Sequence, residues 1–272
     1  MLRDIPPTMD AAAVASIDAR LTALERDERI SLPLAIESGS RAWGFPSPDS
    51  DYDCRFVYIR RKADYLSLFP KRDVIETPLV GDLDINGWDL AKAIKLLLKG
   101  NAVVIEWLTS PIVYRADTRF RSDFLALAGQ VAERAMIAKH YLHLGERQRN
   151  AYFAEGKAVR LKKIFYALRP AAALRWLRYH PGKAVAPMHF PTLLAECDAP
   201  ADVRRLVGDL IEQKAVSREL GIGVLPDIIG DFIDTEYAAA HVEFDTARRT
   251  PSPQARQAAQ FFFDSSLQDF AS

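Results

Sequence analysis

The apolar pattern of this sequence changes near Tyr114, and the change limits the folds that the chain can adopt. Before that point, several short segments alternate or are rich in aromatic and β-branched residues, as strands are: 32–36, 52–60, 73–77 and 82–86. Beyond it, apolar residues recur mainly at helical spacing. We therefore predict an α+β fold: a small mixed β-sheet with helices in a first domain, residues 1–115, followed by a helical domain, residues 116–272.

Two helices are predicted within the first domain. The segment 10–27 places its apolar residues on one helical face, and the segment 88–101 carries an apolar stripe that ends at Gly100. Both helices would cover the predicted sheet.

Composition excludes several broad classes of protein. The 36 basic and 36 acidic side chains cancel, so no overall field recruits nucleic acid or an anionic membrane, and contacts with phosphates must be local. Only two cysteines are present, Cys54 and Cys197, which suits a reducing compartment, and we expect a cytoplasmic protein. No apolar run approaches the ~20 residues that span a bilayer, so membrane insertion is not expected. The sequence does not indicate an oligomeric state.

The stretch ESGSRAWGFPSPDSDYD, residues 37–53, carries the candidate chemistry. On a strand, residues two apart point to the same face, so Asp51 and Asp53 would aim their carboxylates together. A divalent cation relieves the repulsion between them, and hard oxygen ligands suit magnesium. Gly39 lets backbone N–H groups approach a phosphate and the Ser40 hydroxyl can donate to one, which predicts an anion site beside the metal.

Two other interpretations of these aspartates are a polar turn and a calcium loop. Asp and Ser favour turns, so PSPDSDYD by itself is typical of a polar turn at the entrance to a strand. A calcium loop requires a glycine where Cys54 stands and a bidentate glutamate where Arg60 stands, and it is excluded for that reason.

Taken together, several blocks carry a family resemblance. A Gly-Ser pair, ten residues and then Asp-x-Asp followed by a strand resembles the signature of the DNA polymerase beta nucleotidyltransferase superfamily. The blocks SGSRAWGFPSPDSDYDCRFVYI, INGWDLAKAIKLLLKGN, EWLTSPIVY and KKIFYALRP are similar to its RNA-repair-pathway, RlaP-like branch. The resemblance covers roughly residues 30–200 and implies that residues 1–115 form the catalytic domain.

The resemblance also implies roles for particular residues. Gly39 and Ser40 would hold a triphosphate, and Asp51 and Asp53 would bind Mg²⁺. A third catalytic and metal-binding carboxylate would come from a later strand. Asp82 and Asp84 share a face there, so spacing does not choose between them, and the position just before INGWDL favours Asp84.

Further nucleotide-binding candidates lie in LKKIFYALRP. If this segment is helical, spacings of four and three put Lys162, Tyr166 and Arg169 on one face, where cations reach phosphates and the tyrosine stacks on a base or ribose. A solvated basic face is the alternative, and the resemblance favours the nucleotide. Arg41, beside the glycine turn, is a similar candidate, while Glu106 is left outside the catalytic set.

These inferences predict a magnesium-dependent nucleotidyltransferase. It would move a nucleoside monophosphate from a nucleoside triphosphate to an acceptor hydroxyl, and the RNA-repair association of the branch suggests an RNA end. The alternatives are a protein or small-molecule acceptor, or a nucleotide-binding module without catalysis. A continuous basic surface leading away from the aspartates would favour RNA over the other acceptors.

Overall fold

The computed structural model describes residues 1–153, 159–217, 221–244 and 250–271. Its centre is a six-stranded mixed sheet in the order β1-β6-β2-β3-β5-β4. Strands β3 and β5 run parallel and the other neighbours are antiparallel. The strands are β1 (Leu2–Asp4), β2 (Ile30–Glu37), β3 (Tyr52–Arg60), β4 (Val74–Glu76), β5 (Leu83–Asp89) and β6 (Val113–Ala116).

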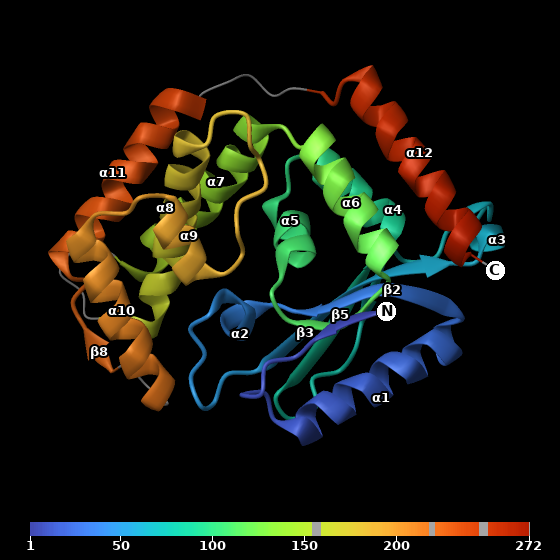
Figure 1. Cartoon of the computed structure of the whole chain (residues 1–272), viewed down its shortest axis with the longest axis horizontal. Coiled ribbons are helices and arrows are strands. Elements are labelled where there is room, and N and C mark those ends of the chain that lie inside the picture. The colour runs from blue at the N-terminus through green and yellow to red at the C-terminus, as the bar shows by residue number, and fades with distance from the viewer. Residues whose placement is uncertain (154–158, 218–220, 245–249, 272) are drawn as a thin grey trace.

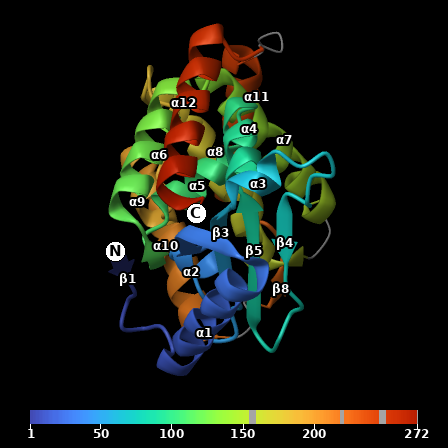
Figure 2. The same ribbon diagram turned by 90° about the vertical axis from the view of Figure 1, so that its right-hand side faces the viewer.

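Helices cover both faces of this sheet. Figure 1 shows α1 (Ala11–Glu28) on one face and α4, α6 and α12 on the other. The bounds of these three helices are Leu90–Leu98 for α4, Thr118–Val131 for α6 and Pro253–Phe270 for α12. A further helix, α5, spans Ala102–Thr109. Both α6 and the C-terminal α12 come from the part of the chain predicted to be a separate helical domain, and Figure 2 shows them side by side above the sheet.

The remaining helices form a group beside the sheet (Figure 1). They are α7 (Arg134–Tyr152), α8 (Ile164–Tyr179), α9 (Phe190–Glu196), α10 (Ala201–Val216) and α11 (Asp227–Phe244). Short elements complete the described chain: α2 (Gly39–Trp43), α3 (Lys62–Tyr65), a 3₁₀ turn (Leu161–Lys163), and the paired β7 (Val159–Arg160) and β8 (Ile222–Gly223).

Side-chain caps fix where the sheet-covering helices begin. Asp10, Asp89, Asn101 and Asp117 each accept a hydrogen bond from a backbone N–H in the first turn of α1, α4, α5 and α6, and Ser252 does so for α12. Such caps each contribute about 0.5–2 kcal/mol. The helix starts therefore follow from local sequence.

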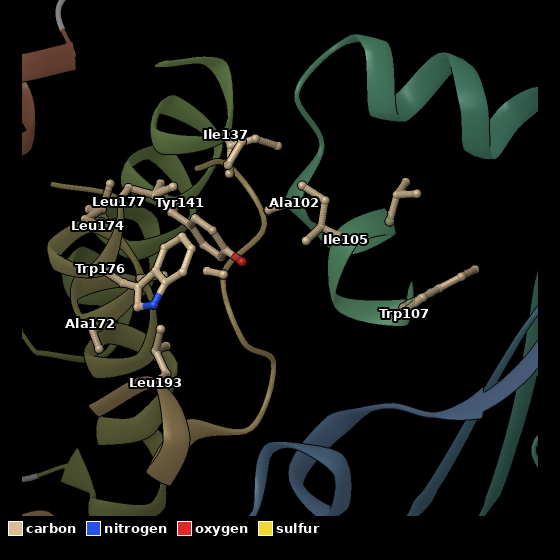
Figure 3. Packing of buried hydrophobic residues seen from close by; sticks show 14 of the residues in the cluster. Ala102, Ile105, Trp107, Ile137, Tyr141, Ala172, Leu174, Trp176, Leu177 and Leu193 are labelled. Atoms are coloured by element: carbon tan, nitrogen blue, oxygen red, sulfur yellow. The ribbon is translucent and has the colours of Figure 1, made fainter. Parts of the chain in front are cut away.

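Alternation along β3 divides the core into two clusters. Cys54, Phe56 and Tyr58 face α1, whereas Val57 and Ile59 belong to the larger cluster on the opposite face. This larger cluster continues without interruption into the helical group. Figure 3 shows Ile105 of α5 directed toward Tyr141 of α7 within it. The sheet and the helical group thus share one core.

No helix among the described residues is long and apolar enough to cross a membrane.

Candidate functional site

Two carboxylates meet where β3 and β5 begin. Asp53 and Asp84 are register partners in the parallel pair. Arg55 bridges them, with Nη2 at 3.1 Å from Asp53 Oδ1 and 2.6 Å from Asp84 Oδ2. Burial raises the pKa of Asp53, and the nearby charges of Asp84 and Asp51 act in the same direction, while Arg55 opposes them. The two carboxylates are therefore close enough to share one cation.

The register also separates the two candidates for the third acid. Asp84 lies on β5 beside Asp53, and its Oδ1 accepts a hydrogen bond of 2.5 Å from Asn86 Nδ2. Asp82 is exposed and precedes the strand, where its backbone carbonyl accepts a hydrogen bond of 2.7 Å from the Tyr52 N–H. The geometry thus brings Asp84, and not the side chain of Asp82, against Asp53.

Gly39 brings the backbone against the same carboxylate. Its φ of 59° lies in the left-handed region, and a Cβ at this position would lie 1.9 Å from Asp53 Oδ2. The preceding Ser38 N–H donates to the Asp53 carbonyl at 2.8 Å. Only glycine fits both the backbone conformation and this close approach.

The loop between α2 and β3 is held by a small polar network. Ser40 Oγ donates to Ser50 Oγ at 2.9 Å, and the Ser47 N–H donates to the same Ser50 oxygen at 2.8 Å. Arg41 donates to the carbonyls of Ser50 and Asp51, at 2.6 and 3.1 Å. Arg41 therefore supports the loop that carries Asp51, while the serine hydroxyls lie near the glycine turn.

A buried acid, Glu37, stands behind this arrangement and was not identified from sequence. Its Oε1 accepts the Asp53 N–H at 2.8 Å and its Oε2 accepts the Tyr114 hydroxyl at 2.5 Å. Burial, which outweighs these two hydrogen bonds, raises the pKa of Glu37 to about 8. The available signal for Glu37 was a charged residue at the end of an otherwise apolar strand. Arg55 was not identified either, and its signal was a position two residues after Asp53 on the same strand.

A pocket of about 440 Å³ opens between the end of the sheet at which β3 begins and the helical group. From the first part of the chain it is lined by the glycine turn, Ser40, Trp43, Phe45, Ser47, Asp49, Ser50, Asp51, Asp53 and Arg55. From the helical part it is lined by Lys162, Lys163, Tyr166 and Lys214. Acidic and basic groups thus face each other across one cavity, with aromatic rings between them.

Lys162 and Tyr166 line the pocket on the wall opposite the acids. The Tyr166 ring makes an edge contact with Trp43 at 6.2 Å, and burial raises its pKa, aided by the charge of Asp53. Lys163 Nζ lies 4.8 Å from the centroids of both Tyr152 and Tyr166. These groups form a cationic and aromatic wall.

Arg169 lies elsewhere. It is 5% exposed, does not line the pocket, and donates through Nη2 to Glu106 Oε1 at 2.7 Å. The same Glu106 oxygen accepts the Tyr141 hydroxyl at 3.1 Å. The guanidinium lies 4.3 Å from the Trp43 ring, so Arg169 reaches the pocket only through that side chain.

The carboxylate pair fits magnesium bound together with substrate phosphates. Among the described residues no group of three or more His, Cys, Asp or Glu side chains is arranged to hold a metal ion. Magnesium is commonly held by only one or two carboxylates plus phosphate oxygens. Asp53 and Asp84 already share one cationic group, the Arg55 guanidinium, and they supply hard oxygen donors.

Comparisons with known proteins identify a family for this chain. Residues 14–264 match RlaP, the RNA repair pathway DNA polymerase beta family. The uncharacterized protein YcgL of Bacillus subtilis (strain 168) is 38% identical over 216 residues, covering 79% of this chain and 82% of that protein. A crystal structure of a nucleotidyltransferase-like protein from Exiguobacterium sibiricum 255-15 aligns with 95% of this chain and 79% of its own, with 11% identity and a TM-score of 0.29.

Proposed function

The chain belongs to the RNA repair pathway DNA polymerase beta family and is a nucleotidyltransferase, and we propose that it moves a nucleoside monophosphate from a nucleoside triphosphate to an RNA end. One observation carries the proposal: the Asp53–Asp84 pair stands at a pocket whose opposite wall is cationic and aromatic. Negative groups that hold a metal and positive groups that hold phosphates are what nucleotidyl transfer needs in one cavity.

The pocket residues suggest how a triphosphate binds. The Gly39 turn offers backbone N–H groups and Ser40 a hydroxyl, and Lys162 supplies positive charge from the facing wall. Tyr166, in edge contact with Trp43, offers a ring against which a base or ribose packs. Arg41 and Arg169 act indirectly, Arg41 by holding the loop of Asp51 and Arg169 by supporting Trp43.

We assign the metal as magnesium, held by the pair Asp53 and Asp84 together with phosphate oxygens, with Asp51 at the pocket as the further ligand that the family resemblance implies. Members of the superfamily generally use divalent metals. When bound, magnesium offsets charge at the triphosphate and lowers the pKa of the acceptor hydroxyl. Asp53 lines the pocket and Asp84 lies beside it, so the two carboxylates would hold the metal at the pocket wall. Glu37 fixes the backbone of Asp53 by accepting the hydrogen bond of the Asp53 N–H.

The reaction is an in-line displacement at the α-phosphorus. The acceptor oxygen forms a bond to this phosphorus as the bond to the bridging oxygen breaks, and pyrophosphate leaves with that electron pair. The acceptor proton passes to a carboxylate, and we assign this role to Asp84, the register partner of Asp53 on β5. Lysines of the facing wall stabilise charge that accumulates on the leaving pyrophosphate.

A basic row on α7 favours RNA as the acceptor. Lys139, His143 and Arg147 are spaced by four residues and so share one face of this helix. The last residue of the helix, Tyr152, contacts Lys163 at the pocket. From Lys139 to Arg147 the row rises about 12 Å along the helix, which suits contact with a short stretch of a strand. The row is local, which agrees with the neutral total charge.

Incubating the protein with each α-labelled triphosphate, magnesium and an RNA pool tests the proposal directly. We expect label on RNA ends with wild-type protein and none with Asp53→Asn, whose melting curve should be unchanged or shifted upward because a buried charge is removed. Label only on protein or a small molecule would reject RNA as the acceptor. No transfer from any triphosphate, or full activity of the Asp53→Asn protein, would reject the mechanism.

A further inference from the structure

Lys214, a residue of α10, is buried at the edge of the nucleotide pocket. It is 6% exposed, yet it lines the cavity together with Ser47, Ser50 and Lys162. Its Nζ donates to the backbone carbonyl of Phe45 at 2.6 Å and lies 5.4 Å from the centroid of the Phe45 ring. A side chain from the helical group thus reaches across to the loop that follows α2.

The ammonium group of Lys214 is incompletely satisfied by the protein. It has three N–H donors, and the Phe45 carbonyl is the one hydrogen-bond acceptor it has among the described residues. It forms no ion pair with a carboxylate within that part of the chain. A buried charge costs free energy unless it is paired, so two free donors at a cavity wall indicate an anionic ligand.

The surrounding charges point the same way. The pKa of Lys214 is lowered to about 8, mainly by burial; the positive charges of Lys162 and Arg41 act in the same direction, while Asp49 opposes them. Several cations therefore converge on this end of the pocket, with Asp49 as the facing carboxylate that acts on Lys214. A bound anion would relieve their repulsion.

We propose that Lys214 binds the terminal phosphates of the nucleoside triphosphate, and holds them as the departing pyrophosphate. This rests on the proposed function and extends it to a residue outside the recognised motifs. We assign Lys214 to the terminal phosphates because it adjoins the loop of Phe45, Ser47 and Ser50 in the pocket. Asp84, to which we assign the acceptor proton, is outside the pocket lining, so Lys214 and Asp84 serve different ends of the reaction.

Phosphate binding by Lys214 would couple nucleotide affinity to pH. Negative charge beside the ammonium raises its pKa in the complex, so binding above pH ~8 takes up a proton and weakens as pH rises. Arginine remains protonated throughout this range. A Lys214→Arg protein should therefore keep the affinity while losing the pH dependence and the proton uptake.

Titration calorimetry in the presence of magnesium measures the nucleotide affinity at pH 7 and pH 9. Repeating it in two buffers of different ionisation enthalpy measures the proton uptake on binding. We expect Lys214→Met to weaken binding of triphosphate and of free pyrophosphate roughly 10- to 100-fold, as loss of a charged hydrogen bond does. Binding of the monophosphate should be unchanged. Lys183→Met, which removes an exposed lysine of the helical group that does not line the pocket, is the matched control.

The outcomes separate this inference from the function on which it rests. If the wild-type protein binds triphosphate and Lys214→Met binds it equally well, the role of Lys214 is wrong and the proposed function stands. An equal loss for the monophosphate would also overturn it, because the terminal phosphates would not be the ligand. Failure of the wild-type protein to bind any triphosphate would overturn the proposed function and this inference together. Melting curves and the Lys214→Arg protein exclude a loss of folding.

Discussion

Replacing Arg169 with methionine should destabilise the protein far more than it weakens nucleotide binding. The side chains of Arg169 and Glu106 are each 6% exposed and form an ion pair of 2.7 Å. The substitution leaves the Glu106 carboxylate buried with the Tyr141 hydroxyl as its remaining donor. Removing one partner of a buried pair costs about 3–5 kcal/mol. For a chain of this size that corresponds to a fall of roughly 6–20 °C in melting temperature.

A double-mutant cycle gives the control. Arg169→Met combined with Glu106→Leu removes both charges, so the double variant should recover most of the lost stability. Nucleotide affinity should fall less in Arg169→Met than in Lys162→Met, because Arg169 acts on the pocket only through Trp43. An unchanged melting temperature together with lost nucleotide affinity would refute this reasoning and favour the direct nucleotide contact that the sequence predicts.

Other substitutions test the remaining geometry. Asp84→Asn should abolish transfer of labelled nucleotide, whereas Asp82→Asn, at an exposed turn position, should retain near wild-type activity. Gly39→Ala should cost at least ~1–2 kcal/mol in thermal unfolding for its left-handed backbone, and transfer should be lost as Asp53 is displaced. Burial raises the pKa of Glu37 from 4.5 to about 8, so the unfolded chain loses this proton first and stability falls between those pH values. Glu37→Gln should flatten the melting temperature across that range, and an unaltered slope would contradict the assignment.

Local rules predicted the strands that carry Asp53 and Asp84, although they did not identify Glu37 behind them. Strand alternation and the apolar segments predicted β2, β3 and β5, and the parallel register then aligns Asp53 with Asp84. The glycine requirement was also visible, although its cause, contact with the Asp53 carboxylate, was not. These features depend on residues close in sequence or on neighbouring strands. The catalytic roles assigned to them stay predictions until transfer is measured.

The predicted position of Arg169 assumed that the whole segment LKKIFYALRP is helical, but α8 begins only at Ile164. Spacings of four and three define a common face only within one continuous helix. Lys162 lies in the 3₁₀ turn Leu161–Lys163, and α8 begins at Ile164, so the rule does not relate Lys162 to Arg169. Arg169 turns instead to the buried Glu106, a partner 63 residues away. Tertiary pairing of this kind leaves no periodic signal.

The burial pattern of α10 draws attention to Lys214, which lies in none of the sequence motifs. The buried positions of α10 are Val203, Val207, Leu210 and Lys214, spaced four, three and four residues apart, as on the apolar face of an amphipathic helix. The last position of that stripe holds a lysine, where burial of charge is costly unless something compensates it. Within the described chain the compensation is one carbonyl of Phe45, 169 residues earlier. A charge retained at a core position, beside a cavity already rich in cations, is best explained by a ligand that supplies the missing negative charge.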